Sequence, residues 1–333
     1  MKREKWIDVL RGIAILAVIA DHIFTLFGTF RIDSIWKHTY FSVSWFIFLS
    51  GVTNGISASK TTWVFPKSYV TFWRKRLTII FPYIFASTVS FLVFTYPHFH
   101  IDGKRYIYEI VHFSNQPIFY YINLLLQLYI IFPFLYVLMN KSKKDWQMVL
   151  LVFGTIFLSF ILQAYTTPPW PFDAGLRVMG GILLAVFFLG VLYGREVFRI
   201  DRYIFIISIL IFTAIEVLLV YTHESIFKSL EHTFYLEAWS ISLLFIIKFL
   251  FDRVRYDNLF SRLLNFLGRH SLFIYLFHFL MIALYTNASW FTFRHYYDFV
   301  PAIIVIIFVS VGMEYIYKKC YDAINLCLRK IHR

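Results

Sequence analysis

The sequence predicts an all-α membrane protein, a polytopic bundle of about ten transmembrane helices with both termini on the inside. Three observations predict it: the composition, ten long apolar segments, and the distribution of Lys and Arg between these segments. Of the 333 residues, 59% are hydrophobic and 15% are charged, and the mean hydropathy is +0.67. A soluble domain of this length has no interior large enough for so much apolar surface.

Ten segments are long enough to cross a bilayer, which takes about 20 apolar residues per helix. No stretch between them is long enough for a second domain, so we expect a single membrane domain over residues 1–333. In chain order the segments are Ile7–Phe30, Tyr40–Ile56, Leu77–Tyr96, Pro117–Met139, Trp146–Tyr165, Gly175–Tyr193, Tyr203–Tyr221, Phe234–Phe251, Leu264–Tyr285 and Phe299–Tyr317.

The basic residues predict the orientation of the bundle. With the N-terminus inside, 24 of the 32 Lys and Arg fall in inside segments and seven in outside segments, while Arg11 lies within the membrane. Such an excess on the cytoplasmic side is typical of multi-pass membrane proteins. The net charge of +13 lies in short loops and forms no single basic face, so we expect membrane lipids, and no nucleic acid, as partners.

The sequence does not indicate a metal site or a disulfide framework. The two cysteines, Cys320 and Cys327, lie seven residues apart on a predicted helix. Several outside loops are rich in His and acidic residues but lack the tight spacing of a zinc motif. These residues are His98, His100, Asp102, Glu109, His112, His223, Glu224, Glu231 and His232.

The first segment carries the most informative polar residues, Asp8, Arg11 and His22. Ionisable side chains inside a membrane are costly and therefore point to function. Asp8 lies three residues before Arg11, on the same helix face, and can pair with it. The eleven residues from Arg11 to His22 make about three turns, which places both on one face roughly 16 Å apart. His22 is suited to take a proton from a hydroxyl, although a structural pair with Asp21 is the alternative.

A basic cluster, Arg74, Lys75 and Arg76, precedes the third segment. Such a cluster either marks the cytoplasmic end of a span or binds phosphate groups, and the residues alone leave both interpretations open.

The ninth segment carries a polar stripe. Ser271, Tyr275 and His278 follow the i, i+4, i+7 spacing of one helix face, and Gly268 suggests a helix start just before them. Polar stripes inside membranes face the interior of the bundle or a cavity. The alternative is hydrogen bonding between helices without catalysis.

Together these stretches resemble the acyltransferase-3 family, integral-membrane O-acyltransferases that act largely on surface glycans. The resemblance covers nearly the whole chain and rests on four pieces in the family's order. They are Asp8-Val-Leu-Arg11-Gly with His22, the aromatic run Phe46 to Gly51, the basic stretch Arg74 to Tyr83, and Gly268, Ser271, Tyr275 and His278.

Two departures from the family pattern are visible. The third helix of the family often carries two arginines three residues apart, whereas this chain has Arg76 followed by Ile79. The extracellular esterase-like domain of some relatives is also not seen, so any extracytoplasmic partner would be a separate protein.

The resemblance implies transfer of an acyl group, expected to be acetyl, to a hydroxyl of a cell-envelope glycan or its lipid-linked precursor. The donor would be a cytoplasmic acyl-CoA such as acetyl-CoA, with no permanently bound cofactor, and the enzyme would lie in the plasma or inner membrane. In this interpretation His22, Arg11 and Asp8 are catalytic. Arg74, Lys75 and Arg76 bind the acyl donor, while Ser271, Tyr275 and His278 bind substrate.

Two other function classes fit the same residues. In a transporter or flippase for a glycan or lipid, Arg11 and His22 would form a proton-coupled gate. A non-catalytic subunit of an envelope synthase would need no donor site. The sequence shows no internal repeat and no pair of interrupted helices of the transporter kind, which favours the enzyme.

Overall fold

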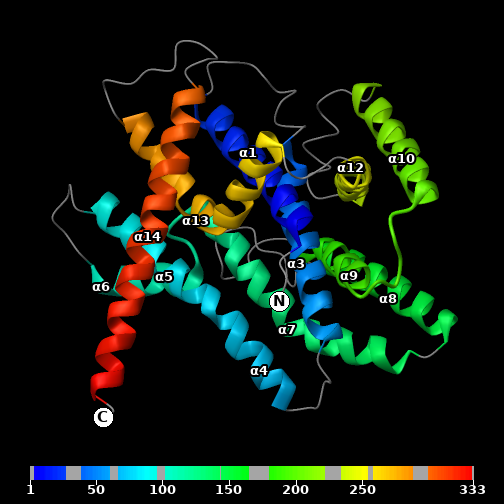
Figure 1. The fold of residues 1–333 in the computed structure, drawn as a ribbon, viewed down its shortest axis with the longest axis horizontal. Coiled ribbons are helices and arrows are strands. Elements are labelled where there is room, and N and C mark those ends of the chain that lie inside the picture. Colours follow the sequence, from blue (N-terminus) through cyan, green and yellow to red (C-terminus); the bar gives the residue numbers. More distant parts are fainter. Residues whose placement is uncertain are drawn as a thin grey trace.

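The structure, a computed structural model, describes residues 4–27, 39–60, 67–95, 102–142, 144–164, 180–221, 234–253, 258–287 and 299–331. Within these ranges the chain forms helices and no strand (Figure 1). The α-helices are α1 (Lys5–Phe27), α3 (Phe41–Ser59), α4 (Lys67–Arg76), α5 (Ile80–Thr95), α6 (Gly103–His112), α7 (Tyr120–Lys141), α8 (Asp145–Ala164), α9 (Leu183–Gly194), α10 (Arg202–Tyr221), α12 (Phe234–Phe251), α13 (Leu259–Asn287) and α14 (Phe299–Ile331). Short 3-10 turns at Leu77–Ile79 and Pro117–Phe119 precede α5 and α7.

Seven helices in the described part of the chain are long and apolar enough to cross a membrane. They cover Phe41–Ser59, Lys67–Phe94, Pro117–Lys141, Asp145–Gln163, Phe234–Phe251, Leu259–Tyr285 and Phe299–Cys327. The chain is thus an all-helical, multi-pass membrane protein. Each of the ten predicted segments contains a helix, but the count of ten spans and the inside location of both termini stay predictions.

Several boundaries differ from the predicted ones. The third span begins at Lys67, so the basic cluster lies on a helix and not in a loop before it. The helix α9 has only 12 residues. The prediction that Gly268 starts a helix is wrong, because α13 runs through it from Leu259. The reason for a glycine there is helix packing.

The helix α1 packs chiefly against α13, at a distance that only glycine permits. A Cβ atom on Gly12 would lie 2.1 Å from the carbonyl oxygen of Leu264, and one on Gly268 would lie 1.7 Å from that of Asp8. Neither position has room for a side chain. Small residues let membrane helices approach closely, and these two glycines fix the register between α1 and α13.

The helix α3 packs against α9 in the same way, through two matching glycine pairs. Gly51 and Gly55 on α3 face Gly190 and Gly194 on α9, so each helix carries a Gly-x-x-x-Gly pattern. A Cβ on Gly51 would lie 2.1 Å from the Phe187 carbonyl oxygen. This pattern is typical of close helix pairs in membranes. It holds the short helix α9 against the longer α3.

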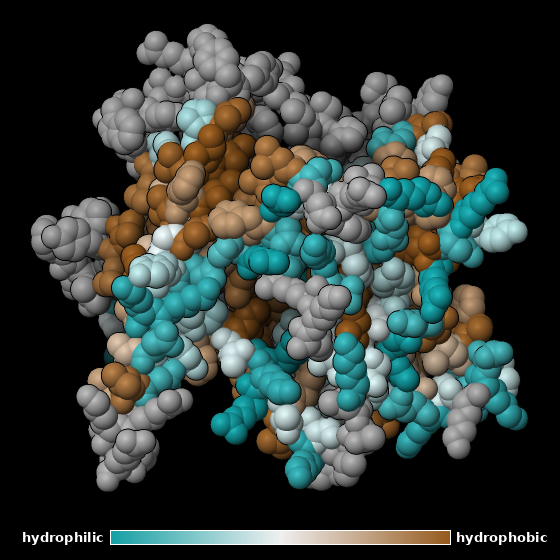
Figure 2. All heavy atoms as spheres, viewed as in Figure 1, coloured by the Kyte–Doolittle hydropathy of each residue, from teal (hydrophilic) through white to brown (hydrophobic). Residues whose placement is uncertain are grey.

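The outer helices expose apolar side chains, as a surface in contact with lipid requires. On α8 the side chains of Phe153 and Phe157 are 66% and 67% exposed. Figure 2 shows hydrophobic residues over the upper left of one face and hydrophilic residues across its centre, right side and lower part. The N-terminal end of α4 and the C-terminal half of α14 extend toward the lower part of the molecule in the same view (Figure 1).

Candidate active site

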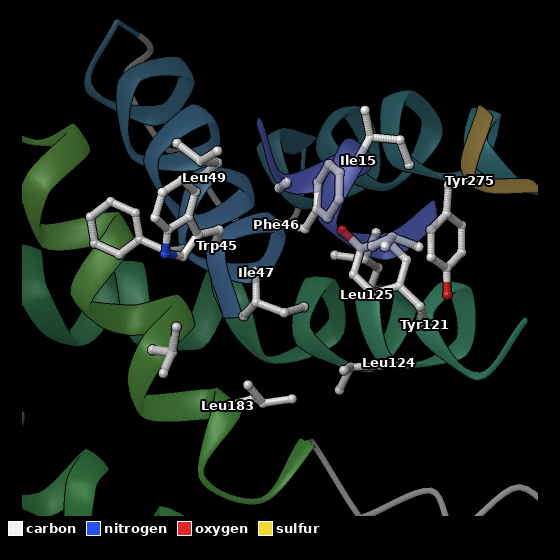
Figure 3. Packing of buried hydrophobic residues seen from close by; sticks show 14 of the residues in the cluster. Ile15, Trp45, Phe46, Ile47, Leu49, Tyr121, Leu124, Leu125, Leu183 and Tyr275 are labelled. Carbon is white, nitrogen blue, oxygen red and sulfur yellow. The ribbon is translucent and has the colours of Figure 1, made fainter. Parts of the chain in front are cut away.

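A cavity of about 180 Å³ lies between α1, α3, α7 and α13. Its wall contains one guanidinium group and several hydroxyl groups among apolar and aromatic side chains. The lining residues are Arg11, Phe46, Ser50, Ile79, Tyr121, Leu125, Tyr129, Ser271, Leu272 and Tyr275. Figure 3 shows four of them, Phe46, Tyr121, Leu125 and Tyr275, converging beside α1. The structure thus brings together Arg11, Ser271 and Tyr275, three of the residues predicted from sequence.

The close α1–α13 contact explains how these three residues meet. Arg11 directly precedes Gly12, which lies against Leu264, and Ser271 lies three residues after Gly268. Because backbone atoms touch backbone atoms on both sides, neither helix can shift along the other without a clash. A site on two helices locked in this way is held more precisely than a site on loops.

The hydroxyl groups of the cavity differ in what they can still donate. The Ser271 hydroxyl donates to the Gly268 carbonyl oxygen, with 2.9 Å between the oxygens, and the Tyr275 hydroxyl donates to the Ile118 carbonyl oxygen. The Ser50 and Tyr129 hydroxyls lie 3.0 Å apart and share one hydrogen bond. Two hydroxyls that share one hydrogen bond keep one further O–H, so this pair can donate one hydrogen bond to a group in the cavity.

Sequence reasoning missed Tyr129. Tyr129 lies two helical turns after Tyr121 on the same face of α7, and this spacing is the signal in the sequence that could have indicated it. The pairing with Ser50 depends on how α3 packs against α7, which the sequence does not reveal. In the sequence, Ser50 is part of the run Phe46 to Gly51, which indicated only the family resemblance.

The predicted donor-binding cluster divides into two parts. Arg74 and Lys75 are exposed, whereas Arg76 turns toward the bundle. The Arg76 guanidinium lies 5.3 Å from the ring centre of Phe72 and 5.4 Å from that of Tyr129, within the range of cation–π attraction. Its Nε atom is buried and has no hydrogen-bond partner among the described residues. The Tyr129 ring, which lines the cavity, therefore lies against Arg76.

His22 lies beside His278 and outside the wall of this cavity. The two imidazole rings are 5.1 Å apart between centroids, and the ring of Phe279 meets His22 edge-on at 5.6 Å. His278 is fully buried, and its Nδ1 atom lies 2.6 Å from the Tyr275 carbonyl oxygen. The Tyr275 ring contacts the His278 ring at 5.6 Å, so Tyr275 links the histidine pair to the cavity that holds Arg11.

Asp8 is buried against α13. Its Oδ2 atom lies 3.9 Å from Nε of Arg269, the residue that follows the close-contact Gly268. Sequence reasoning did not consider Arg269, and the predicted Asp8–Arg11 pair stays a prediction. A second ionic group is also new: His270 on α13 contacts one carboxylate oxygen of Glu314 on α14 and so joins the two helices, while Lys318 on α14 contacts the other oxygen.

Metal ligands do not gather in the described part of the chain, where no three His, Cys, Asp or Glu side chains come together. Most of the histidines noted in the outside loops, namely His98, His100, His223 and His232, lie outside the described residues.

A family model described as an acyltransferase domain, the acyltransferase-3 model, matches residues 4–317. The chain belongs to the acyltransferase-3 family. The resemblance seen in the sequence is thereby confirmed. No curated protein and no solved structure matches the chain. The match runs from α1 into α14 and includes every residue that lines the cavity, together with His22 and His278.

In this membrane acyltransferase the cavity has the groups that acyl transfer requires. Attack on a thioester or ester carbonyl places negative charge on the carbonyl oxygen, and nearby cations and O–H donors lower the barrier. Arg11 and the Ser50–Tyr129 pair supply such groups in a largely apolar wall. The low dielectric constant of such surroundings strengthens both interactions.

Proposed function

We propose that the chain is a membrane O-acyltransferase that transfers an acyl group from cytoplasmic acyl-CoA. We expect this group to be acetyl. The acceptor is a hydroxyl of a cell-envelope glycan or of its lipid-linked precursor, and the membrane is the plasma or inner membrane. The observation that carries this proposal is the cavity in which Arg11 meets the Ser50–Tyr129 pair, Ser271 and Tyr275.

The donor side of the proposal rests on the basic end of the third span. Coenzyme A is polyanionic, and Arg and Lys bind phosphate oxygens through charge-assisted hydrogen bonds. Arg74 and Lys75 are exposed in the last turn of α4, which we assign to the cytoplasmic side. Arg76 lies in the same turn, against the Tyr129 ring that lines the cavity. In this arrangement the phosphates stay at the surface while the thioester reaches inward past Tyr129.

Ile79 shapes the same route. It lines the cavity three residues after Arg76, at the position where many relatives carry a second arginine. An apolar side chain there leaves Arg11 as the guanidinium at the reacting end, and Arg74 to Arg76 as the donor-binding group.

The acceptor side rests on His22. A neutral imidazole has a nitrogen lone pair that can remove a proton from a sugar hydroxyl as that oxygen attacks the acyl carbon. Asp8, held against α13, supports the N-terminal turn that carries Arg11. The acyl carbon then gains the C–O bond and loses the C–S bond, and the thiolate of coenzyme A leaves.

The first test compares envelope glycans from cells that lack the protein with glycans from cells that carry wild type, Arg11→Gln or Arg105→Gln. Arg105 is the matched control, because it lies on the exposed helix α6 and pairs only with Glu109 at the surface, where such pairs contribute little. We expect mass spectrometry to find an ester, removable by mild base, with wild type and Arg105→Gln. Arg11→Gln should lower it at least about 10²-fold, the typical loss for one stabilising group at the reacting oxygen.

The opposite result is also specific. If no ester distinguishes wild-type cells from cells that lack the protein, the acyltransferase proposal fails. A change in the distribution of a glycan or lipid across the membrane, with no ester missing, would favour a transporter or flippase.

A further inference from the structure

The facing pair His22 and His278 carries an inference that rests on the proposed function and concerns how the proton leaves the acceptor hydroxyl. The rings lie on different helices, α1 and α13, with centroids 5.1 Å apart and planes tilted by 34°. No described side chain other than Tyr275 and Phe279 has a ring contact with either of them. The pair therefore sits in an aromatic pocket next to the Arg11 cavity.

The hydrogen bond of His278 determines which of its nitrogens carries a proton. The Tyr275 carbonyl oxygen, 2.6 Å from Nδ1, can only accept, so Nδ1–H is the donor. In a neutral imidazole the other nitrogen, Nε2, then has a lone pair and no proton. Nε2 is buried and has no hydrogen-bond partner among the described residues. A buried acceptor of this kind ordinarily has a partner, because losing its water without replacement is costly.

The separation of the two rings suits one particular partner. An N–H···N bond of about 3 Å, with roughly 1 Å from each nitrogen to its ring centre, gives centroids about 5 Å apart. His22 and His278 are at that separation, but the hydrogen bond itself is not formed in this structure. Catalytic hydrogen bonds are often long or misaligned without substrate and tighten when it binds. We expect the same of this one when the acceptor binds.

We propose that His278 is a positioning residue whose Nε2 atom accepts the N–H of His22 and so turns the remaining lone pair of His22 toward the acceptor hydroxyl. The Tyr275 carbonyl fixes His278, His278 fixes His22, and His22 takes the hydroxyl proton. As in other nucleophile–base systems, a third group orients the base.

The step balances as follows. The hydroxyl oxygen forms the new C–O bond to the acyl carbon, and its proton moves to the free nitrogen of His22. The C–S bond breaks with its electron pair on sulfur, and the imidazolium of His22 returns the proton to the thiolate. The N–H shared with His278 stabilises the imidazolium in between, because the Nε2 lone pair faces the positive ring.

A direct role for His278 at the oxyanion fits the structure less well. In the tautomer that the Tyr275 carbonyl imposes, its second nitrogen has no hydrogen to donate to a negative oxygen. His278 is also absent from the wall of the Arg11 cavity, whereas Ser271 and Tyr275 are part of it.

Two substitutions of His278 separate this role from mere packing. The amide of His278→Asn can keep the bond to Tyr275 but does not reach the position of Nε2. The oxygen of His278→Gln reaches that position and can accept from His22. His112→Asn is the matched control, since His112 on the surface helix α6 makes the same kind of Nδ1 contact, 2.8 Å, to the Tyr108 carbonyl oxygen.

The assay uses membrane vesicles that contain the full chain and saturating labelled acetyl-CoA, and it records label in the mild-base-labile ester. We expect His278→Asn to lower the maximal rate about 10²-fold, with the KM for acetyl-CoA unchanged. His278→Gln should be about tenfold faster than His278→Asn, because an acceptor is restored. His112→Asn should match wild type.

Three results would overturn the assignment: His278→Asn within about twofold of wild type, His278→Gln no faster than His278→Asn, or an equal loss in His112→Asn. If His278→Asn does not assemble in the membrane, His278→Gln decides alone. A rate within about tenfold of wild type supports the assignment, and a larger loss contradicts it. Wild-type vesicles that form no ester would remove the proposed function, and this inference with it.

Discussion

Arg11 is a charged side chain within an apolar helix, and its immediate neighbours decide what it does. It opens onto a cavity with Ser271 and Tyr275, two residues of the polar stripe that the sequence predicts to face the interior of the bundle or a cavity. That prediction was possible because ionisable and polar residues are rare inside membranes, so each one stands out in the sequence. The Ser50–Tyr129 pair and the inward turn of Arg76 were not predictable, because hydroxyls and surface arginines are common and only the packing of α3, α4 and α7 gives them a role.

At this scale the Tyr129 hydroxyl is the sharpest test of the cavity chemistry. Tyr129→Phe keeps the ring that faces Arg76 but removes the hydroxyl, and we expect the rate of ester formation to fall about 10²-fold, the usual effect of losing one oxyanion donor. Initial rates in membrane vesicles measure this.

The control is Tyr136→Phe on the same helix. The Tyr136 hydroxyl is also buried, but it donates to the Ala58 carbonyl oxygen, 2.9 Å away and outside the cavity. That variant should lose about 1 kcal/mol of stability with little change in rate. Equal rates in the two variants would show that the hydroxyl of Tyr129 has no special part in the reaction.

The helices α1 and α13 form the element on which the site depends. Their ranges were predicted approximately, because long apolar runs mark membrane helices well. The role of Gly268 was predicted wrongly: a glycine next to a polar stripe suggested a helix start, whereas here it admits the backbone of Asp8. Local sequence does not distinguish the two uses, since only the partner helix shows that a side chain has no room. The same holds for the paired Gly-x-x-x-Gly patterns of α3 and α9.

The helix contact predicts a contrast between two glycines. Gly268→Ala places a Cβ atom 1.7 Å from the Asp8 carbonyl oxygen, so α1 and α13 must move apart. We expect a loss of at least about 1–3 kcal/mol, with the ester lost as well, because Arg11 and Ser271 no longer meet. Thermal unfolding of the purified protein in detergent, together with the ester assay, measures both effects.

Gly154→Ala provides the comparison. Gly154 lies on the exposed face of α8, where a Cβ atom meets nothing within 4 Å. Alanine there should leave stability and activity nearly unchanged. A Gly268→Ala protein as stable and active as Gly154→Ala would contradict the close contact between α1 and α13.

At the scale of the whole molecule, the loop charges predict that the bundle separates a basic side from an opposite side on which the acceptor is proposed to lie. The fold class and the family were predictable because composition and motif order extend over the whole chain. The number of spans was less predictable, because α9 is only 12 residues long and most of its side chains are buried. Loop charges predict the orientation because they act during insertion into the membrane.

The most direct measurement of the central claim is acyl transfer in sealed membrane vesicles of known orientation. Labelled acetyl-CoA is added outside inside-out and right-side-out vesicles that contain wild type or Arg11→Gln. We predict that wild-type inside-out vesicles, which expose the Arg74–Arg76 end of the bundle, place label in a mild-base-labile glycan ester. Right-side-out vesicles and Arg11→Gln should not. Equal labelling with and without the protein, or labelling that does not depend on Arg11, would contradict the proposed transfer across this bundle.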